Sequence, residues 1–220
     1  MKLVIGNKNY SSWSLRPWLA LRVAGIAFEE QRIPLDEPDS KARMLAVSPA
    51  GRVPVLIDGS TVIWDSLAIC EYAAERFPSS GLWPSDPLLR AKARSISAEM
   101  HSGYSGLRNA MPMNCRGRHP GKGQTPAALA DIARIVELWS DALAASGGPF
   151  LFGSFTIADA FHAPVVSRFV THAVPLPALC QRYVDTVQAL PAMVEWNAAG
   201  AIESEWVAAD EPYADPPAAA

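Results

Sequence analysis

The sequence is poor in cysteine and lacks the spacings that most cysteine chemistry needs. Its three cysteines, Cys70, Cys115 and Cys180, lie far apart and form no CxxC pair and no Cys/His metal-binding pattern. We therefore expect no metal site and the reduced thiols of a cytoplasmic protein. Cys70 falls on the apolar face of a predicted helix at 66–77, so we expect it in the core.

Long apolar runs and a large excess of one charge are also missing. No stretch of about 18 residues is continuously apolar, so the sequence predicts no transmembrane helix. The apolar run near the N-terminus is too short for a signal peptide and predicts a strand at 2–6. With 19 Lys and Arg against 22 Asp and Glu, the formal net charge is −3, which gives no support to nucleic-acid binding.

A hairpin signal carrying a proline is the most informative feature that is present. Two β-branched runs, at 53–57 and 61–64, flank the dipeptide Asp58-Gly59, which is typical of tight hairpin turns. Pro54 cannot donate a ladder hydrogen bond, so it lies at an outer edge or follows a cis peptide bond. The hairpin therefore presents an edge with free backbone groups.

The dipeptide Asp65-Ser66 directly after the hairpin opens an apolar-periodic segment, as residues at a helix N-terminus do. A free strand edge beside a helix N-terminus suits an extended peptide whose carboxylate the helix N-terminus attracts. The alternative is an ordinary hairpin followed by a helix that Asp65-Ser66 merely caps.

The chain divides into a mixed α/β part and an all-helical part. Strand patterns at 2–6 and 28–33, helix patterns at 14–25 and 39–47, the hairpin and the helix at 66–77 indicate a small α/β domain with a mixed sheet. Helical patterns follow at 88–110, 126–146, 156–171, 177–190 and 191–199. We predict an α/β domain at 1–78, a linker at 79–87, an all-helical domain at 88–209 and a loose tail at 210–220. Thr156 and Asp159 form a capping box, which we interpret as structural.

The segment Arg52-Val53-Pro54, the hairpin and Asp65-Ser66 together resemble the glutathione-binding half of cytosolic glutathione transferases, and the two-part order fits that family along nearly the whole chain. The resemblance implies a thioredoxin-like domain with a cis bond before Pro54, followed by a helical-bundle domain. It also implies that glutathione is the cosubstrate. Val53 would pair its backbone with the cysteinyl unit, Asp65 and Ser66 would hold the γ-glutamyl end, and Arg52 belongs to the same binding segment.

The loop after the first strand resembles the Ser-Ser-Cys-Ser-Trp-Arg signature of the zeta class of these enzymes. The match implies that Ser11 stabilises the glutathione thiolate, with Ser12 as its neighbour. Trp13 stands where zeta has cysteine, which puts the zeta isomerase activity in doubt; with no thiol in the loop, redox chemistry is disfavoured. Tyr10 is a rival donor because some classes use tyrosine. Helix capping is the alternative role for each serine, including Ser14.

A hydrogen bond from one hydroxyl, together with the helix N-terminus, is strong enough to lower the pKa of the glutathione thiol by about two units. A free thiol has a pKa near 8.5, and lowering it by about two units requires roughly 2.7 kcal/mol of preference for the anion. A hydrogen bond to a charged group contributes about 1.5–3 kcal/mol, and a helix N-terminus adds about 0.3–1 kcal/mol. The hydroxyl therefore need only donate to the thiolate and need not take its proton.

A second-substrate pocket is expected over the first domain, against the helix after the linker. The segment Leu107-Arg108-Asn109 resembles a zeta segment that reaches this pocket, and we assign Tyr10, Trp13, Arg108 and Asn109 to it.

Further polar residues lie near that segment in the sequence. Asn114, Arg116 and Arg118 would attract an anionic cosubstrate, although a solvated cationic loop is the favoured interpretation for the two arginines. Arg168 lies in a later helix out of register with the carboxylate-binding arginine of zeta, so that role is not transferred to it.

The resemblance therefore implies a glutathione S-transferase of bacterial type that adds the glutathione thiolate to a small electrophile, acts in detoxification and forms a homodimer. It implies no nucleic-acid and no membrane partner. Two alternatives stay open. One is a glutathione-dependent cis–trans isomerase similar to maleylacetoacetate isomerase, and the other is a non-catalytic binding protein of the same fold.

Overall fold

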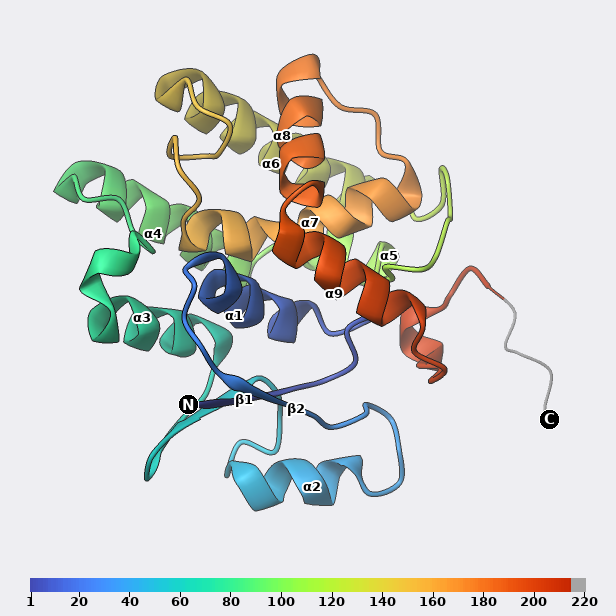
Figure 1. Cartoon of the computed structure of the whole chain (residues 1–220). Coiled ribbons are helices and arrows are strands. Elements are labelled where there is room, and N and C mark those ends of the chain that lie inside the picture. Colours follow the sequence, from blue (N-terminus) through green and yellow to red (C-terminus); the bar gives the residue numbers. More distant parts are fainter. Residues whose placement is uncertain (215–220) are drawn as a thin grey trace.

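A computed structural model describes residues 1–214 of the chain, and a four-stranded mixed sheet forms its first part (Figure 1). The strand order is β2-β1-β3-β4, with β1 parallel to β2 and antiparallel to β3, which pairs with β4 as the predicted hairpin. The strands are β1 (Lys2–Ile5), β2 (Glu29–Arg32), β3 (Val55–Asp58) and β4 (Thr61–Ile63). This arrangement confirms the thioredoxin-like α/β fold that the sequence predicts.

Successive side chains of a strand point to opposite faces of the sheet, and helices cover both faces. Leu3 and Leu56 point toward the core cluster that includes α1 (Ser12–Val23) and α3 (Ser66–Arg76). Val4 belongs to a separate cluster on the opposite face, which α2 (Ser40–Val47) covers. Figure 1 shows α2 on one side of the sheet and α1 and α3 on the other.

The second part is built around one buried helix, α7 (Ile157–His172). Within α7 only Val170 escapes burial, because α1, α4 and α8 all pack against it. The contact between α1 and α7 joins the two parts of the chain and positions the loop before α1 at their junction. The surrounding helices are α4 (Pro87–Ser102), α5 (Ser105–Ala110), α6 (Pro126–Ser146), α8 (Ala178–Gln188) and α9 (Pro191–Ala201).

The predicted single helix at 88–110 is wrong, because the chain breaks it at Gly103. The backbone N–H of Gly103 bonds back to the carbonyl of Glu99, and a Cβ at Gly103 would lie 2.8 Å from that oxygen. Tyr104 then adopts a left-handed conformation with φ 61° before α5 begins. Glycine is therefore required where α4 ends, and the helix direction changes before Arg108.

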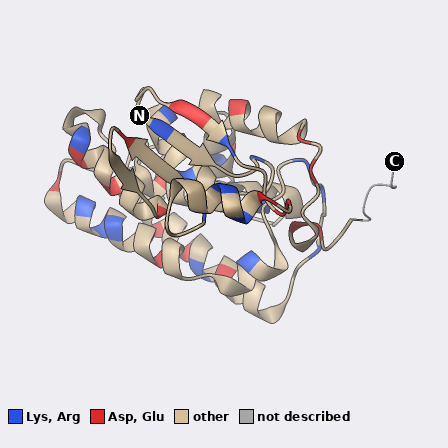
Figure 2. Ribbon diagram, turned by 90° about the horizontal axis from the view of Figure 1, so that it is seen from below, with Lys and Arg blue, Asp and Glu red and all other residues tan. Residues whose placement is uncertain are grey.

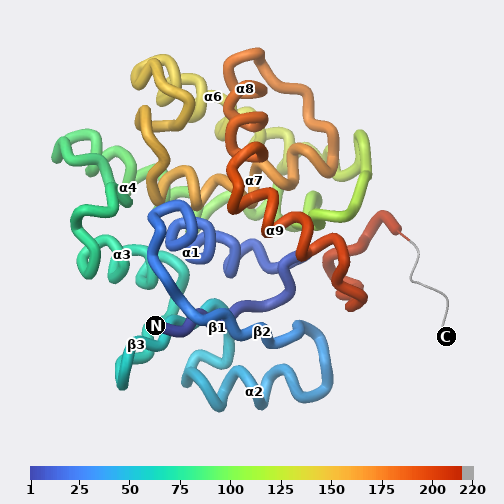
Figure 3. Tube along the Cα trace, viewed as in Figure 1, coloured from blue at the N-terminus to red at the C-terminus, as the bar shows by residue number. Residues whose placement is uncertain are grey.

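The predicted loose tail is also wrong for its described part, 210–214. After the short turn η2 (Ala208–Asp210), the Glu211 carboxylate accepts hydrogen bonds at 2.7 Å from both Tyr10 and Asn114. Tyr213 donates to the carbonyl of Ala110 at 2.7 Å. These bonds hold the C-terminal segment beside the loop before α1, as Figure 3 shows. Residues 215–220 lie outside the described residues.

Surface charge is mixed rather than segregated. Figure 2 shows Lys and Arg interspersed with Asp and Glu over both parts of the chain. Several of these charges pair, for example Arg94 with Glu71 at 3.0 Å and Arg134 with Glu99 at 2.9 Å. Within residues 1–214, no helix has both the length and the apolar character needed to span a membrane.

Candidate functional site

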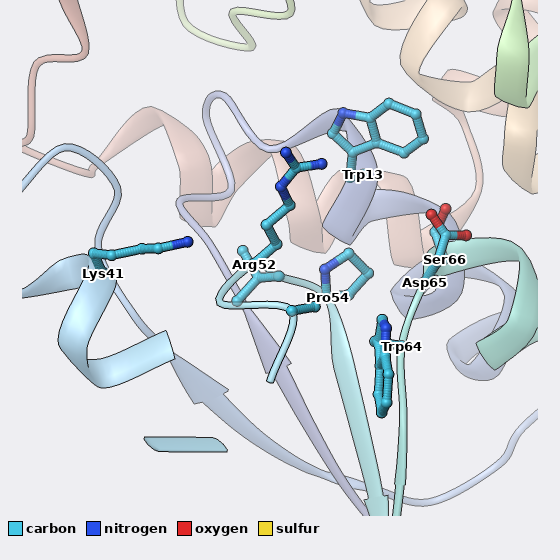
Figure 4. Close-up of a pocket in the computed structure, with 9 residues that line it drawn as sticks. Trp13, Lys41, Arg52, Pro54, Trp64, Asp65 and Ser66 are labelled. Atoms are coloured by element: carbon cyan, nitrogen blue, oxygen red, sulfur yellow. The ribbon is translucent and has the colours of Figure 1, made fainter. Parts of the chain in front are cut away.

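A first cavity of about 480 Å³ opens between the hairpin, the start of α1 and the start of α3. Figure 4 shows Lys41 and Arg52 approaching it from one side and Asp65 and Ser66 from the other. All five residues that the sequence assigns to the peptide site lie in its wall. The lining residues are Trp13, Lys41, Ala50, Arg52, Val53, Pro54, Trp64, Asp65 and Ser66.

The edge of the first cavity has the backbone that an extended peptide needs. The Val53–Pro54 bond is cis, which confirms the expectation from the sequence. The paired register of β3 begins at Val55, and no hydrogen bond to the backbone of Val53 occurs within residues 1–214. The N–H and C=O of Val53 are therefore available to a ligand that extends the sheet.

Asp65 and Ser66 form the opposite wall at the start of α3. The Asp65 carboxylate caps the helix by accepting from the Leu67 N–H at 2.8 Å, and its other oxygen lies 3.5 Å from Nε2 of His101. The Ser66 hydroxyl is buried and has no hydrogen-bond partner among residues 1–214. Because a buried hydroxyl without a partner costs free energy, this position suits a ligand acceptor.

Burial is the main influence on the ionisation of His101. It lowers the pKa of the imidazole, and the charges of Arg16 and Arg108 lower it further, while Asp65 opposes them. His101 is therefore largely neutral at pH 7, and the negative charge of Asp65 stays available to a cationic group in the first cavity.

A second cavity of about 400 Å³ continues from the first and shares Trp13, Arg52 and Val53 with it. It brings together three groups that are distant in sequence: the loop before α1, two arginines from helices α5 and α7, and a carboxylate from the C-terminal segment. Its other lining residues are Tyr10, Ser11, Ser12, Leu35, Met44, Arg108, Arg168 and Asp210.

Three serines at the start of α1 differ in how their hydroxyls are engaged. Ser11 is the N-cap: its oxygen accepts from the Ser14 N–H at 3.3 Å, and its hydroxyl donates to the Ser14 oxygen at 2.8 Å. Ser14 is fully buried and also accepts from the Gly6 N–H at 3.0 Å. The hydroxyl of Ser12 makes no hydrogen bond within residues 1–214. Ser11 thus has the capping role that the sequence left open, while it also lines the second cavity.

Trp13 lies at the junction of the two cavities between two guanidinium groups. The Arg16 carbon Cζ lies 4.2 Å from the Trp13 ring centroid, and that of Arg108 lies 4.8 Å from it. None of the three side-chain nitrogens of Arg16 has a hydrogen-bond partner among residues 1–214. Burial, followed by the charges of Arg108 and Arg168, lowers the pKa of Arg16 well below its ordinary value. The start of α1 therefore brings two guanidinium groups, those of Arg16 and Arg108, beside Trp13.

Four other polar residues named from the sequence line neither cavity. Asn109 lines neither cavity: it is exposed, because a helix turns successive side chains by about 100° and Arg108 takes the inward position. Arg118 is exposed, as expected. Asn114 and Arg116 bind the C-terminal segment through Glu211, so Arg116 is not part of a solvated loop.

Sequence reasoning missed several residues that line the cavities, among them three with charged or aromatic side chains. Lys41 and Trp64 line the first cavity, and Asp210 lines the second. A lysine at the start of a short helix and an exposed tryptophan after the hairpin carry no local signal of a site. Asp210 lies in the segment that composition alone predicts to be loose.

Comparisons with known proteins match both parts of the chain to one family. Residues 10–76 match the model "Glutathione S-transferase, N-terminal domain", and residues 122–199 match "Glutathione S-transferase, C-terminal domain". A maleylacetoacetate isomerase from Rattus norvegicus is 33% identical over 177 residues, covering 77% of this chain and 80% of the relative. A probable maleylacetoacetate isomerase from Caenorhabditis elegans is 29% identical over 188 residues, covering 84% and 87%.

Solved structures show the same fold. A glutathione transferase homologue from Burkholderia, crystallised with bound glutathione, superposes with a TM-score of 0.70 at 23% identity and covers 90% of this chain and 96% of that one. At this identity the similarity establishes the fold, and the chemistry of the cavities has to be argued from the residues that line them.

Proposed function

The chain belongs to the glutathione S-transferase family, and we propose that it binds glutathione in the first cavity and stabilises its thiolate for attack on a small electrophile in the second. The observation that carries this proposal is the buried hydroxyl of Ser66 at the N-terminus of α3, which has no hydrogen-bond partner among residues 1–214. A carboxylate bound there would supply the missing acceptor and would meet the positive end of the helix dipole.

The first cavity offers a partner for each end of glutathione. The γ-glutamyl carboxylate meets Ser66, and its ammonium meets Asp65. The backbone of Val53 pairs with the cysteinyl unit. Lys41 and Arg52, on the opposite side of the first cavity, hold the glycyl carboxylate. This orientation places the sulfur near the start of α1, where the two cavities meet.

The thiolate is stabilised there by a serine hydroxyl and by the charge at the start of α1. Ser11 turns its hydroxyl from Ser14 to the sulfur, because a bond to an anion is roughly twice as strong as one between neutral groups. Ser14 can then donate its own hydrogen to the Ser11 oxygen, so the pair reinforces the bond to sulfur. Ser12 is the second candidate, since its hydroxyl needs no rearrangement. A homodimer and a cytoplasmic location are part of the same proposal.

A glutathione-dependent cis–trans isomerase is the second candidate function. Two relatives bear the name maleylacetoacetate isomerase, and Arg108 and Arg168 give the second cavity a positive charge that suits an anionic substrate. Trp13 at the place of the zeta cysteine weighs against this candidate. Both reactions need the same glutathione thiolate, so one experiment tests their common basis.

The test is calorimetric titration with glutathione, together with the ultraviolet difference absorbance of the bound thiolate at neutral pH. S-methylglutathione is the matched control, because it fits the first cavity but has no thiol to ionise. We expect both ligands to bind and only glutathione to give the thiolate band. Binding without the band would favour the non-catalytic alternative, and no binding by either ligand would refute the proposal.

A further inference from the structure

The second cavity contains one acidic side chain among several arginines. Asp210 lines it together with Arg52, Arg108 and Arg168. Its neighbours in the C-terminal segment are paired: Glu205 lies 2.7 Å from Arg32, and Glu211 lies 3.3 Å from Arg116. Asp210 forms no ion pair and accepts no side-chain hydrogen bond within residues 1–214. Its carboxylate is thus available to whatever occupies the second cavity.

Asp210 is held in this position from both sides. Val207, three residues before it, is buried in the fold. Glu211, the next residue, is buried and binds Tyr10 and Asn114. The 3-10 turn that ends at Asp210 is therefore fixed at its start and its end. A carboxylate on such a turn has a defined place in the cavity wall.

The groups around Asp210 act on its charge in opposite directions. Burial, opposed by the charge of Arg168 on α7 and reinforced by the negative charges of Glu211 and Asp36, raises the pKa of Asp210 to about 6. The carboxyl therefore loses negative charge as the pH falls from 7.5 to 5.5. The charge that Asp210 presents to the second cavity therefore changes within a pH range that binding experiments can reach.

The charge of Asp210 acts on the buried Arg168, but no hydrogen bond ties the Asp210 side chain to the fold within residues 1–214. The carboxylate of Asp159, which does support the fold, accepts from two backbone N–H groups, from Thr156 and from Tyr183. Asp210 has no such donors among residues 1–214. Asp210 is half-buried in the cavity wall, so its carboxylate can accept a hydrogen bond from a ligand bound in the second cavity.

Arg168 gives the second cavity a complementary preference. Its Nε donates to the Met111 carbonyl at 2.8 Å and its Nη1 to the Pro164 carbonyl at 3.2 Å. Nη2 of Arg168 donates no hydrogen bond within residues 1–214. The second cavity thus offers a cationic donor on α7 and an anionic acceptor on the C-terminal segment.

We propose that Asp210 determines the specificity for the second substrate by selecting electrophiles that carry a hydrogen-bond donor, an ammonium or a hydroxyl group, and by disfavouring a carboxylate at that position. The inference rests on the proposed function, because it requires glutathione in the first cavity to direct the electrophile into the second. Asp210 contributes a binding preference and takes no part in forming the thiolate.

The test uses glutathione S-conjugates whose substituents differ in one group. The probes are S-propylglutathione, S-(2-aminoethyl)glutathione and S-(2-carboxyethyl)glutathione, and their dissociation constants are measured by calorimetry at pH 7.5 and 5.5. We expect the wild-type protein to prefer the aminoethyl over the propyl conjugate by about tenfold at pH 7.5, the size of a hydrogen bond to a charged group. The preference should shrink at pH 5.5, where a larger share of Asp210 is protonated.

Asp210→Asn keeps the shape of the side chain and removes its charge, and Asp141→Asn, on the exposed face of α6, is the matched control. We expect Asp210→Asn to abolish the aminoethyl preference and to improve the carboxyethyl-to-propyl affinity ratio, while Asp141→Asn keeps the wild-type ratios. Equal ratios in wild type and Asp210→Asn would overturn the inference and leave the proposed function standing. Failure of all three conjugates to bind would overturn both.

Discussion

The hydroxyl of Tyr10 donates a hydrogen bond to the carboxylate of Glu211 across 2.7 Å, joining residues 201 positions apart. The Tyr10 oxygen also accepts from Arg116. Burial, and then Glu211, raises the pKa of Tyr10 to about 12. The tyrosine hydroxyl is therefore committed to the C-terminal segment and is a poor donor for a thiolate in the second cavity.

Tyr10→Phe should consequently lower the free energy of unfolding and leave the pKa of bound glutathione nearly unchanged. Loss of the hydroxyl leaves the buried Glu211 carboxylate with one donor fewer, which costs about 1–3 kcal/mol in the free energy of unfolding. Urea unfolding measures that loss, and the pKa of bound glutathione, read from thiolate absorbance, should stay at its wild-type value. A raised thiol pKa with unchanged unfolding would assign the thiolate to Tyr10 and contradict the serine assignment.

Ser66→Ala should weaken glutathione binding by about 1.5–3 kcal/mol, the contribution of a hydrogen bond to a charged group. The buried hydroxyl has no partner among residues 1–214, so its removal should scarcely change the free energy of unfolding. Calorimetry gives the dissociation constant. Ser95→Ala, on the exposed face of α4, is the control and should bind as the wild type does. An unchanged dissociation constant for Ser66→Ala would count against the γ-glutamyl site.

Asp159→Ala should destabilise the fold by about 3 kcal/mol or more, because it leaves several buried donors unpaired at once. The carboxylate accepts from Leu151 N–H at 3.0 Å, from Thr156 N–H at 2.8 Å and from Tyr183 at 3.1 Å. Thr156→Ala removes one cap and should cost about 1 kcal/mol. Urea unfolding ranks the two variants. Folded Asp159→Ala protein should still bind glutathione normally, and a specific loss of affinity would argue that this box does more than support α7.

The residues that the sequence predicts well are those whose signals are local. Asp58-Gly59 specifies its hairpin and Thr156 its helix start, because each acts on backbone within a few residues. The second cavity depends instead on contacts between distant segments. Asp210 is held there by the burial of Val207 and by the bonds of Glu211 to Tyr10 and Asn114, and no pattern near residue 210 encodes partners so far away.

The break at Gly103 illustrates a different limit. One glycine within an apolar-periodic run is compatible with a continuous helix, so periodicity predicts a single helix over 88–110. The close approach of Gly103 to the Glu99 carbonyl and the left-handed Tyr104 decide otherwise. The break determines which way α5 faces, and it explains why Arg108 enters the second cavity while Asn109 does not.

The protein should form a two-fold dimer in which the first domain of one chain meets the helical domain of the other, as the family resemblance implies. Leu88, 82% exposed at the start of α4, is an apolar side chain that an interface would cover. Sedimentation equilibrium should give twice the chain mass, and Leu88→Glu should weaken the association. A concentration-independent monomer of the wild-type chain would refute the dimer.

Ser11 should prove to be the main donor to the thiolate. Losing a bond of about 1.5–3 kcal/mol to the ionised sulfur raises the bound thiol pKa by about one to two units. Ser11→Ala should therefore show that shift when thiolate absorbance is titrated against pH, with turnover reduced more than glutathione affinity. Ser11→Ala also removes the N-cap of α1, so Ser11→Thr is the control: it keeps both the cap and the hydroxyl and should restore most of the low pKa.

Ser12→Ala decides between the two serines. The Ser12 hydroxyl makes no hydrogen bond within residues 1–214 and lines the second cavity, whereas that of Ser11 must leave Ser14 before it can donate to sulfur. A hydrogen bond from Ser11 to the ionised sulfur should be stronger than the neutral Ser11–Ser14 bond. Ser12→Ala should therefore shift the thiol pKa by much less than Ser11→Ala does. Ser14→Ala should then cause an intermediate shift, because it removes the hydroxyl behind Ser11. A full shift in Ser12→Ala with none in Ser11→Ala would move the catalytic role to Ser12 and leave Ser11 as a helix cap.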